Sequence, residues 1–423
     1  MVYLTSANPP PPQTKRPIKV YNFFLLFSSR RRMLVPTRTV SEEAVEKGWL
    51  WSVQPLVTWA KWLGIDLSSG QKFSRCFVLY SLFVLLISMS IQLLCLSYVI
   101  DNHKEISVTF TIEISYNSDT FSWNTAMDYV NFAVHSLATH VIFLSIFRAR
   151  WNLLGETFQN FESFLKFSFF DRIRKASILG LVWIILLHTS LLATNLYHHS
   201  EYGSSFLILF CSLVSVFSQV YPITAIVLFS VVCYASSNAH QSIRMELNLL
   251  KNTTTDGNYY NRLSTLKRRH ALVCETVDHI NHCFGFFMGI SLSFHFVSMI
   301  TASFYLFGTD KEPGSVLEIG FACTQICNLS LICYPADLIR LKADSVLRKL
   351  IRMQLEMEEP LKSLTNAFAE QTSLFFPQIN AAGFYPISRK IIPQIVGTTL
   401  SYFFILYQFQ SAERSDTSVN AGI

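Results

Sequence analysis

The chain has 423 residues, of which 51% are hydrophobic and 15% are charged. Soluble globular domains carry about 25% charged residues, so this composition excludes a protein whose only solvent is water. The net charge of +6 requires no nucleic-acid partner, because its cationic residues lie where membrane insertion would place them.

Seven hydrophobic runs of about 20 residues follow one another along the chain, and a helix of that length crosses a hydrocarbon core about 30 Å thick. They predict an all-α, polytopic membrane protein with membrane lipid around it. The predicted spans are, in chain order, 76–100, 127–147, 176–196, 206–234, 284–306, 315–335 and 391–409.

Lysine and arginine are unevenly distributed among the eight segments that flank or join these spans. The first, third, fifth and seventh segments hold 31 of the 34 cationic residues, and the other four hold 3. Because cationic side chains are retained on the cytoplasmic side during insertion, this bias predicts a cytosolic N-terminus and an extracellular C-terminus.

The long segments on the cationic side repeat apolar residues every three or four positions, which predicts helices that continue from their spans. Three regions follow. They are a cytosolic N-terminal region, 1–75, with an interfacial helix near 56–67; a transmembrane domain, 76–409, with cytosolic helical extensions 235–283 and 336–390; and a short extracellular tail, 410–423.

The last span carries a polar stripe. On a helical wheel of 100° per residue, five residues share an arc of about 80°. They are Gln394, Thr398, Ser401, Ile405 and Gln408. Lipid does not accommodate amides and hydroxyls that lack partners, so this face is predicted to meet protein or water. Two interpretations follow: hydrogen-bonded helix packing, or a pore wall in which Ile405 is a hydrophobic gate.

The residues 401–409, SYFFILYQF, resemble the Thr-Tyr, five hydrophobics, Gln-Phe signature that closes the last helix of insect gustatory receptors. Ser401 replaces the usual Thr and keeps the hydroxyl. The residues 382–387, AGFYPI, resemble the Gly-Phe-Phe stretch of the same family, and the inverted seven-span layout fits nearly the whole chain. Sugar-type members carry an acidic residue where this chain has Phe403, so the resemblance to them is weaker.

The resemblance implies a homotetrameric, weakly selective cation channel with the last helix of each subunit around one central pore. It implies a small-molecule tastant as ligand, assembly alone or with related receptors, and the plasma membrane of sensory neurons as location. By the motif match, Gln408 and Phe409 would lie at the outer gate, and Tyr402 would pack below it.

Polar residues also occur at middle or outer depths of the other spans, where ionisable groups are functional candidates. Together they would line an outward-facing pocket of the aromatic, hydrogen-bonding kind that binds small molecules. Each is, on its own, also typical of a packing residue. These residues are Asp128, His188, Asn195, His295, Tyr305, Glu318 and Gln325.

No enzyme, cofactor or metal site is predicted. His279, His282 and Cys283 have ligand-like spacing, but a fourth ligand is missing. No phosphate loop, nucleophile elbow or paired catalytic carboxylates are present. Two alternatives stay open: a seven-helix receptor that signals through a cytosolic partner, which requires the opposite orientation, and a secondary transporter, which would need internal repeats.

Overall fold

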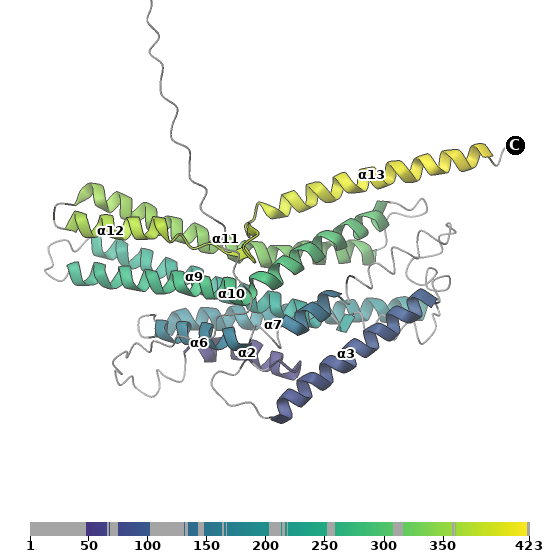
Figure 1. Ribbon diagram of the computed structural model, residues 1–423, viewed down its shortest axis with the longest axis horizontal. Helices are drawn as coiled ribbons and strands as arrows, with labels where there is room; N and C mark the ends of the chain where they lie inside the picture. Colours follow the sequence, from purple (N-terminus) through teal and green to yellow (C-terminus); the bar gives the residue numbers. More distant parts are fainter. Residues whose placement is uncertain are drawn as a thin grey trace, which may run out of the picture. The chain divides into compact units, whose positions relative to one another are not determined.

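The structure is a computed structural model, and it confirms the all-α fold (Figure 1). Its described residues are 48–65, 67, 75–101, 131, 134–142, 148–162, 165, 167–202, 213, 216–217, 219–251, 259–307, 316–357, 359 and 361–420. Its labelled helices are α2 (Trp49–Trp62), α3 (Arg75–Asp101), α6 (Arg148–Glu162), α7 (Phe167–Tyr202), α9 (Val220–Lys251), α10 (Tyr259–Phe307), α11 (Val316–Glu356), α12 (Leu361–Leu374) and α13 (Ile391–Asn420).

Each predicted span falls on helical backbone, although 127–147 and 206–234 are described only in part. Among the described residues, four helices are long and apolar enough to cross a membrane, and they lie in α7, α9, α10 and α11. The 49 residues of α10 extend over roughly 70 Å, more than twice the hydrocarbon thickness of about 30 Å. The charged halves of α9, α10 and α11 therefore continue beyond their apolar spans, as the apolar spacing predicts.

Helix α2 begins and ends earlier than the predicted interfacial helix. It ends at Trp62 because Gly64 has a φ of +81°, a left-handed conformation that glycine adopts without steric cost. The amides of Gly64 and Ile65 donate to the carbonyls of Lys61 and Ala60, at 3.0 and 2.9 Å, which is the hydrogen-bond pattern of a Schellman cap. The buried face of α2 packs against α6 and α7.

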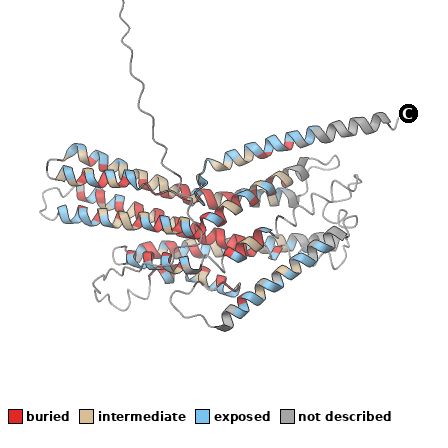
Figure 2. Ribbon diagram, in the orientation of Figure 1, coloured by how far each residue is buried: buried red, intermediate tan, exposed pale blue. Residues whose placement is uncertain are grey.

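Helix α9 lies at the centre of the packing, against α7, α10 and α11 (Figure 1). Figure 2 shows buried residues along much of its length, whereas α3 and α13 expose many apolar side chains. Pro335 inside α11 has no amide to bond the carbonyl four residues earlier, that of Leu331. Ser230 of α9 places its hydroxyl 2.5 Å from this carbonyl oxygen, so a polar bond joins the two apolar helices at that point.

A short antiparallel hairpin, β1 (Asn380–Ala381) and β2 (Tyr385–Pro386), separates α12 from α13. The sequence predicts helix here, and that prediction is wrong. Ala382 and Gly383 have φ values of +51° and +80°, and the amide of Phe384 donates to the carbonyl of Ala381 at 2.9 Å. Two consecutive residues with positive φ at the centre of a four-residue turn are characteristic of type I′, which reverses the chain between β1 and β2.

The hairpin is fixed to α10 by backbone contacts. Asn281 of α10 donates from its side-chain amide to the carbonyl of Gln378 and accepts from the amide of Asn380, both at 2.8 Å. One turn further along α10, a Cβ on Gly285 would lie 3.0 Å from the Asn380 carbonyl oxygen and 3.1 Å from the Ala382 nitrogen. Only a residue without a side chain allows so close an approach of two backbones.

Ala382 is a site where substitution is expected to stabilise the protein. A residue with a Cβ in the left-handed region costs about 1–2 kcal/mol, and Asn-Gly is the preferred pair for a type I′ turn. The Ala382 side chain is exposed, so Ala382→Asn has room. We expect Ala382→Asn to raise the midpoint of thermal unfolding in detergent, and Ala382→Val to lower it. The opposite order would contradict the turn.

Candidate functional site

Polar side chains pair within the apolar layer between residues 131–142, α10 and α11. A ring nitrogen of His135, Nε2, lies 3.0 Å from Ser291 Oγ, and His295 Nδ1 lies 2.5 Å from Gln325 Oε1. The two imidazole rings meet edge to face with their centroids 6.1 Å apart. Both histidines are buried, and pairing of this kind lowers the cost of placing polar groups among apolar ones.

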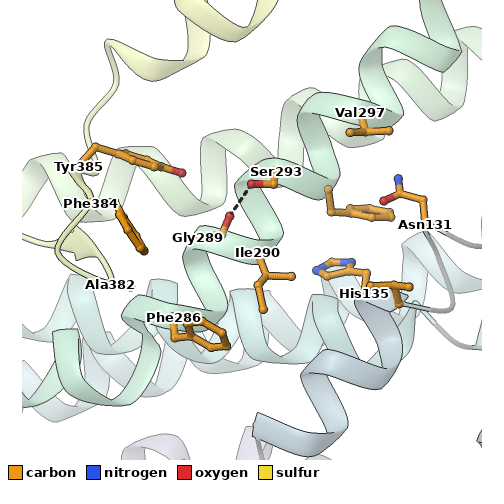
Figure 3. Close-up of a pocket in the computed structure, with 12 residues that line it drawn as sticks. Asn131, His135, Phe286, Gly289, Ile290, Ser293, Val297, Ala382, Phe384 and Tyr385 are labelled. Atoms are coloured by element: carbon orange, nitrogen blue, oxygen red, sulfur yellow. Dashed lines mark hydrogen bonds between the residues drawn. The ribbon is translucent and has the colours of Figure 1, made fainter. Parts of the chain in front are cut away.

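A cavity of about 360 Å³ opens beside His135 (Figure 3). This volume lies within the range of small-molecule sites, which is about 300–1,000 Å³. Three parts of the chain that are distant in sequence form its wall, namely Asn131 with Val134 and His135, one face of α10, and the hairpin. Its lining residues are Asn131, Val134, His135, Phe286, Gly289, Ile290, Ser293, Phe294, Val297, Ala382, Phe384 and Tyr385.

The wall is largely aromatic and aliphatic, and its polar groups are few. His135 stacks on Phe294 with ring centroids 4.1 Å apart, and its Nδ1 is buried without a hydrogen-bond partner among the described residues. The Ser293 hydroxyl donates to the Gly289 carbonyl at 3.0 Å. A mainly apolar compartment of this kind suits a small, mainly apolar molecule.

The predicted outer pocket is not this cavity, since none of its seven residues belongs to the described lining. His295 and Gln325 bond to each other, and His188 Nδ1 lies 2.6 Å from the Ile184 carbonyl oxygen of its own helix. The other four lie outside the residues or side chains that the structure describes, and their role stays a prediction. These four are Asp128, Asn195, Tyr305 and Glu318.

The polar stripe of α13 faces away from the rest of its own chain. Its members with described side chains are all exposed: Gln394, Thr398, Ser401, Ile405 and Gln408. Thr399 and Phe403, which lie about 140° and 180° from Gln394 on the wheel, are buried. The Thr398 hydroxyl donates to the carbonyl of Gln394 at 2.8 Å, and the Ser401 hydroxyl to that of Gly397 at 3.0 Å. Each hydroxyl oxygen keeps lone-pair capacity toward the exposed side.

Tyr402 and Phe409 are the other two residues that the 401–409 motif singles out. The Tyr402 side chain is described and half exposed. Its ring lies 6.3 Å from that of Phe296 on α10, at an interplanar angle of 71°. The Phe409 side chain lies outside the described part of the chain, and the α13 backbone continues as a helix to Asn420, beyond the predicted end of the span. The pore and gate assignments stay predictions.

An ion-pair cluster joins the hairpin side of α13 to α11. The carboxylate of Asp337 is buried, with 4% of its side chain exposed, and accepts from Arg389 Nε at 2.6 Å and from Arg340 Nε at 3.1 Å. The Arg389 guanidinium also lies 5.6 Å from the centre of the Tyr334 ring. Arg389 lies two residues before α13, so this cluster fixes the beginning of the helix that carries the stripe.

Sequence reasoning missed the cavity wall and this ion-pair cluster. Asn131, His135 and the α10 residues were available as polar or aromatic positions on predicted spans, but nothing in their spacing indicates that they meet the hairpin. The one signal for the hairpin was Gly383, since glycine is a strong local signal for a turn.

Long apolar helices with paired polar groups between them define a polytopic α-helical membrane protein, in which the cavity is a candidate small-molecule site. The sequence model described as 7tm Chemosensory receptor matches residues 54–413. Because this match covers most of the chain, the protein belongs to the 7tm chemosensory receptor family.

Relatives and solved structures agree with this assignment. The chain is 28% identical over 118 residues to the Gustatory and odorant receptor 24 of Anopheles gambiae, a match that spans 26% of each protein. The structure of the insect olfactory receptor OR5 from Machilis hrabei in complex with eugenol superposes with a TM-score of 0.59 at 12% identity. A second structure of the same receptor superposes with a TM-score of 0.58 at 14% identity. Both cover 85% of this chain and 100% of the receptor, and they show a shared fold.

Proposed function

We propose that this protein is a gustatory receptor that works as a ligand-gated, weakly selective cation channel for small-molecule tastants. In this proposal the N-terminus is cytosolic, the protein lies in the plasma membrane of sensory neurons, and four α13 helices surround one pore. The subunits are four copies of this chain or copies mixed with related receptors. No catalytic step is part of this function.

The observation that carries the proposal is the orientation of α13. Its buried face, with Thr399 and Phe403, packs on its own chain, while the stripe from Gln394 to Gln408 is exposed. Lipid is an unfavourable environment for such a face. A polar face of about 80° suits a pore to which each of four subunits contributes one helix. The hydroxyls of Thr398 and Ser401 would then offer oxygen dipoles to a passing cation.

The cavity supports ligand control of this pore. Its hairpin wall, through Ala382, Phe384 and Tyr385, is followed within a few residues by Arg389 and the first turn of α13. A ligand that binds better when the hairpin and α13 are in the open arrangement would increase the open population in proportion to that difference in affinity. The mainly apolar groups around the cavity favour a mainly apolar tastant.

The direct test is to purify the chain, reconstitute it alone in planar bilayers and record currents against a panel of tastants. Agonist-dependent cation currents from the purified protein are expected. A receptor that needs a cytosolic partner would give ligand binding without current in this system, and a transporter would give flux that saturates without unitary openings. Flux of that kind, or ligand binding without current both alone and after reconstitution with related receptors, would overturn the proposal.

The cavity assignment is tested by filling it. Ser293 is exposed and lines the cavity, so Ser293→Trp places an indole there without disturbing buried packing. We expect the agonist concentration for half-maximal current to rise by about tenfold or more, which corresponds to a loss of about 1.4 kcal/mol in the free energy of ligand binding. The matched control is Thr189→Trp, because Thr189 is also exposed and bonds the carbonyl four residues earlier, but lies outside the lining. Equal effects of the two variants would place the ligand elsewhere.

A further inference from the structure

Two histidines and a cysteine come together where the polar halves of α9 and α10 pack side by side. His240 lies beyond the predicted span 206–234, and His270 and Cys274 lie before the span 284–306. One ligand atom from each side chain lies within 4.8 Å of the other two. His240 and His270 are buried and Cys274 is half-buried. The ring centroids of His240 and His270 are 5.5 Å apart, and Cys274 Sγ lies 3.7 Å from His270 Nδ1.

The His240 ring is oriented as a metal ligand. Its Nδ1 lies 3.0 Å from the Ser236 carbonyl oxygen. A carbonyl only accepts, so Nδ1 carries the proton and Nε2 bears a lone pair. This Nε2 is buried and has no hydrogen-bond partner among the described residues. Metal-binding histidines characteristically donate their other nitrogen to a carbonyl or carboxylate in this way, whereas a buried nitrogen without any partner costs stability.

Burial favours the neutral, metal-binding form of the two imidazoles and opposes the thiolate form of the cysteine. Burial, opposed by the bond to Ser236, lowers the pKa of His240 to about 4, and burial together with nearby His240 lowers the pKa of His270 to about 3. Both imidazoles are therefore neutral at physiological pH, which is the state that binds metals. Burial and Asp278 raise the pKa of the Cys274 thiol to about 12, so the thiol is protonated until a metal replaces its proton.

We propose that His240, His270 and Cys274 bind one Zn²⁺ ion that joins α9 to α10. Imidazole nitrogen and cysteine thiolate are usual protein ligands of Zn²⁺, and a tetrahedral site with three protein ligands takes a water molecule as the fourth. Donor atoms around a tetrahedral zinc are about 3.5 Å apart, since its bonds are about 2.0–2.3 Å long. The side chains therefore move closer by about 1 Å when they bind. The zinc–sulfur bond forms as the S–H bond breaks, and the proton passes to solvent.

This site is separate from the cavity and the α13 stripe, and it does not depend on the channel function. The ion would add a bond between two helices that already pack side by side and share the ion pair of Glu246 and Arg269 at 2.8 Å. The site lies next to α12, whose Phe368 ring is 5.6 Å from that of His270. A crosslink there stabilises the helical extensions against opening. The sequence points to no such site, because His240 is 30 residues from His270 and only the fold brings them together.

The test uses the full chain in detergent, purified through a tag without histidine and treated with chelator. Co²⁺ added to this protein is expected to give the absorption bands of a tetrahedral site and a thiolate-to-cobalt charge-transfer band, saturating at one ion per chain. Zn²⁺ should abolish these bands and raise the midpoint of thermal unfolding. Wild-type protein without the charge-transfer band, or without a thermal shift on adding Zn²⁺, would overturn the proposal.

Variants assign the ligands. Cys274→Ser is expected to lose the charge-transfer band, and His240→Gln to weaken Co²⁺ binding by at least about tenfold. The controls are Cys323→Ser and His282→Gln, which change an exposed cysteine and an exposed histidine and should leave both readouts unchanged. If Cys274→Ser does not fold, His240→Gln decides, because its Nε2 has no described partner to lose. A charge-transfer band that survives in folded Cys274→Ser, or an unchanged Co²⁺ affinity in folded His240→Gln, would refute this assignment.

Discussion

Ile405→Ala is expected to produce cation current in the absence of any ligand. Ile405 is the one aliphatic member of the α13 stripe, it is 48% exposed in the single chain, and four copies around an axis would form a hydrophobic ring. A ring of that kind closes a pore by excluding water, so smaller side chains admit water and ions. We expect the ligand-free current, divided by the amount of protein at the cell surface, to increase by at least about tenfold.

The matched control is Leu400→Ala on the same helix. Leu400 is also exposed and loses side-chain volume of the same kind, but it lies about 120° from Gln394 on the wheel, outside the stripe. Its variant should keep wild-type leak, conductance and ion selectivity. Whole-cell currents with surface labelling make this comparison. If Leu400→Ala leaks as much as Ile405→Ala, then the effect comes from loosened packing and the stripe does not line the pore.

The helices could be predicted from sequence because their signals are local and long. A run of about 20 apolar residues requires no partner to be recognised, and the continuation of α9, α10 and α11 beyond the membrane follows from charges at regular spacing. Shorter sequence patterns predicted the structure less accurately. Gly64 marks the end of α2, and the predicted helix ran past it. The hairpin at 380–386 has strands of two residues each, too short for any alternation to appear.

Sites could be predicted only where one segment contains them. The stripe lies on one helix, so its membership follows from the helical repeat alone. His295 and Gln325 were recognised as polar residues in spans, but only the fold shows that their 2.5 Å contact joins α10 to α11. The cavity needs three segments and the His240, His270 and Cys274 cluster needs two helices. Packing, which brings these residues together, leaves no mark on spacing along the chain.

Arg389→Gln is expected to weaken the response of the pore to ligand. Arg389 and Lys390 precede the N-terminus of α13, where the helix dipole disfavours cations. Arg389 is therefore not explained by an interaction with its own helix. Its reason is Asp337, whose buried carboxylate accepts from Arg389 Nε at 2.6 Å and so ties α13 to α11. The substitution removes one charge-assisted bond, worth about 1 kcal/mol after allowance for the half-exposed guanidinium.

Folding should survive Arg389→Gln, because Asp337 keeps its bond to Arg340 at 3.1 Å. That second bond lies within α11 and does not reach α13, so Arg340→Gln is the matched control. We expect agonist-evoked current per surface receptor to fall by about threefold or more in Arg389→Gln and by less than about twofold in Arg340→Gln.

A double-mutant cycle separates coupling from general damage. Asp337→Asn alone removes the partner of Arg389, so adding Arg389→Gln to it should change the evoked current little further, and the two effects will not add. Additive effects would mean that Arg389 acts through something other than Asp337. If Arg389→Gln and Arg340→Gln reduce the current equally, the ion pair only supports α11. The mechanical link from the cavity wall to the pore would then have to run through the hairpin backbone and its contacts with Asn281 and Gly285.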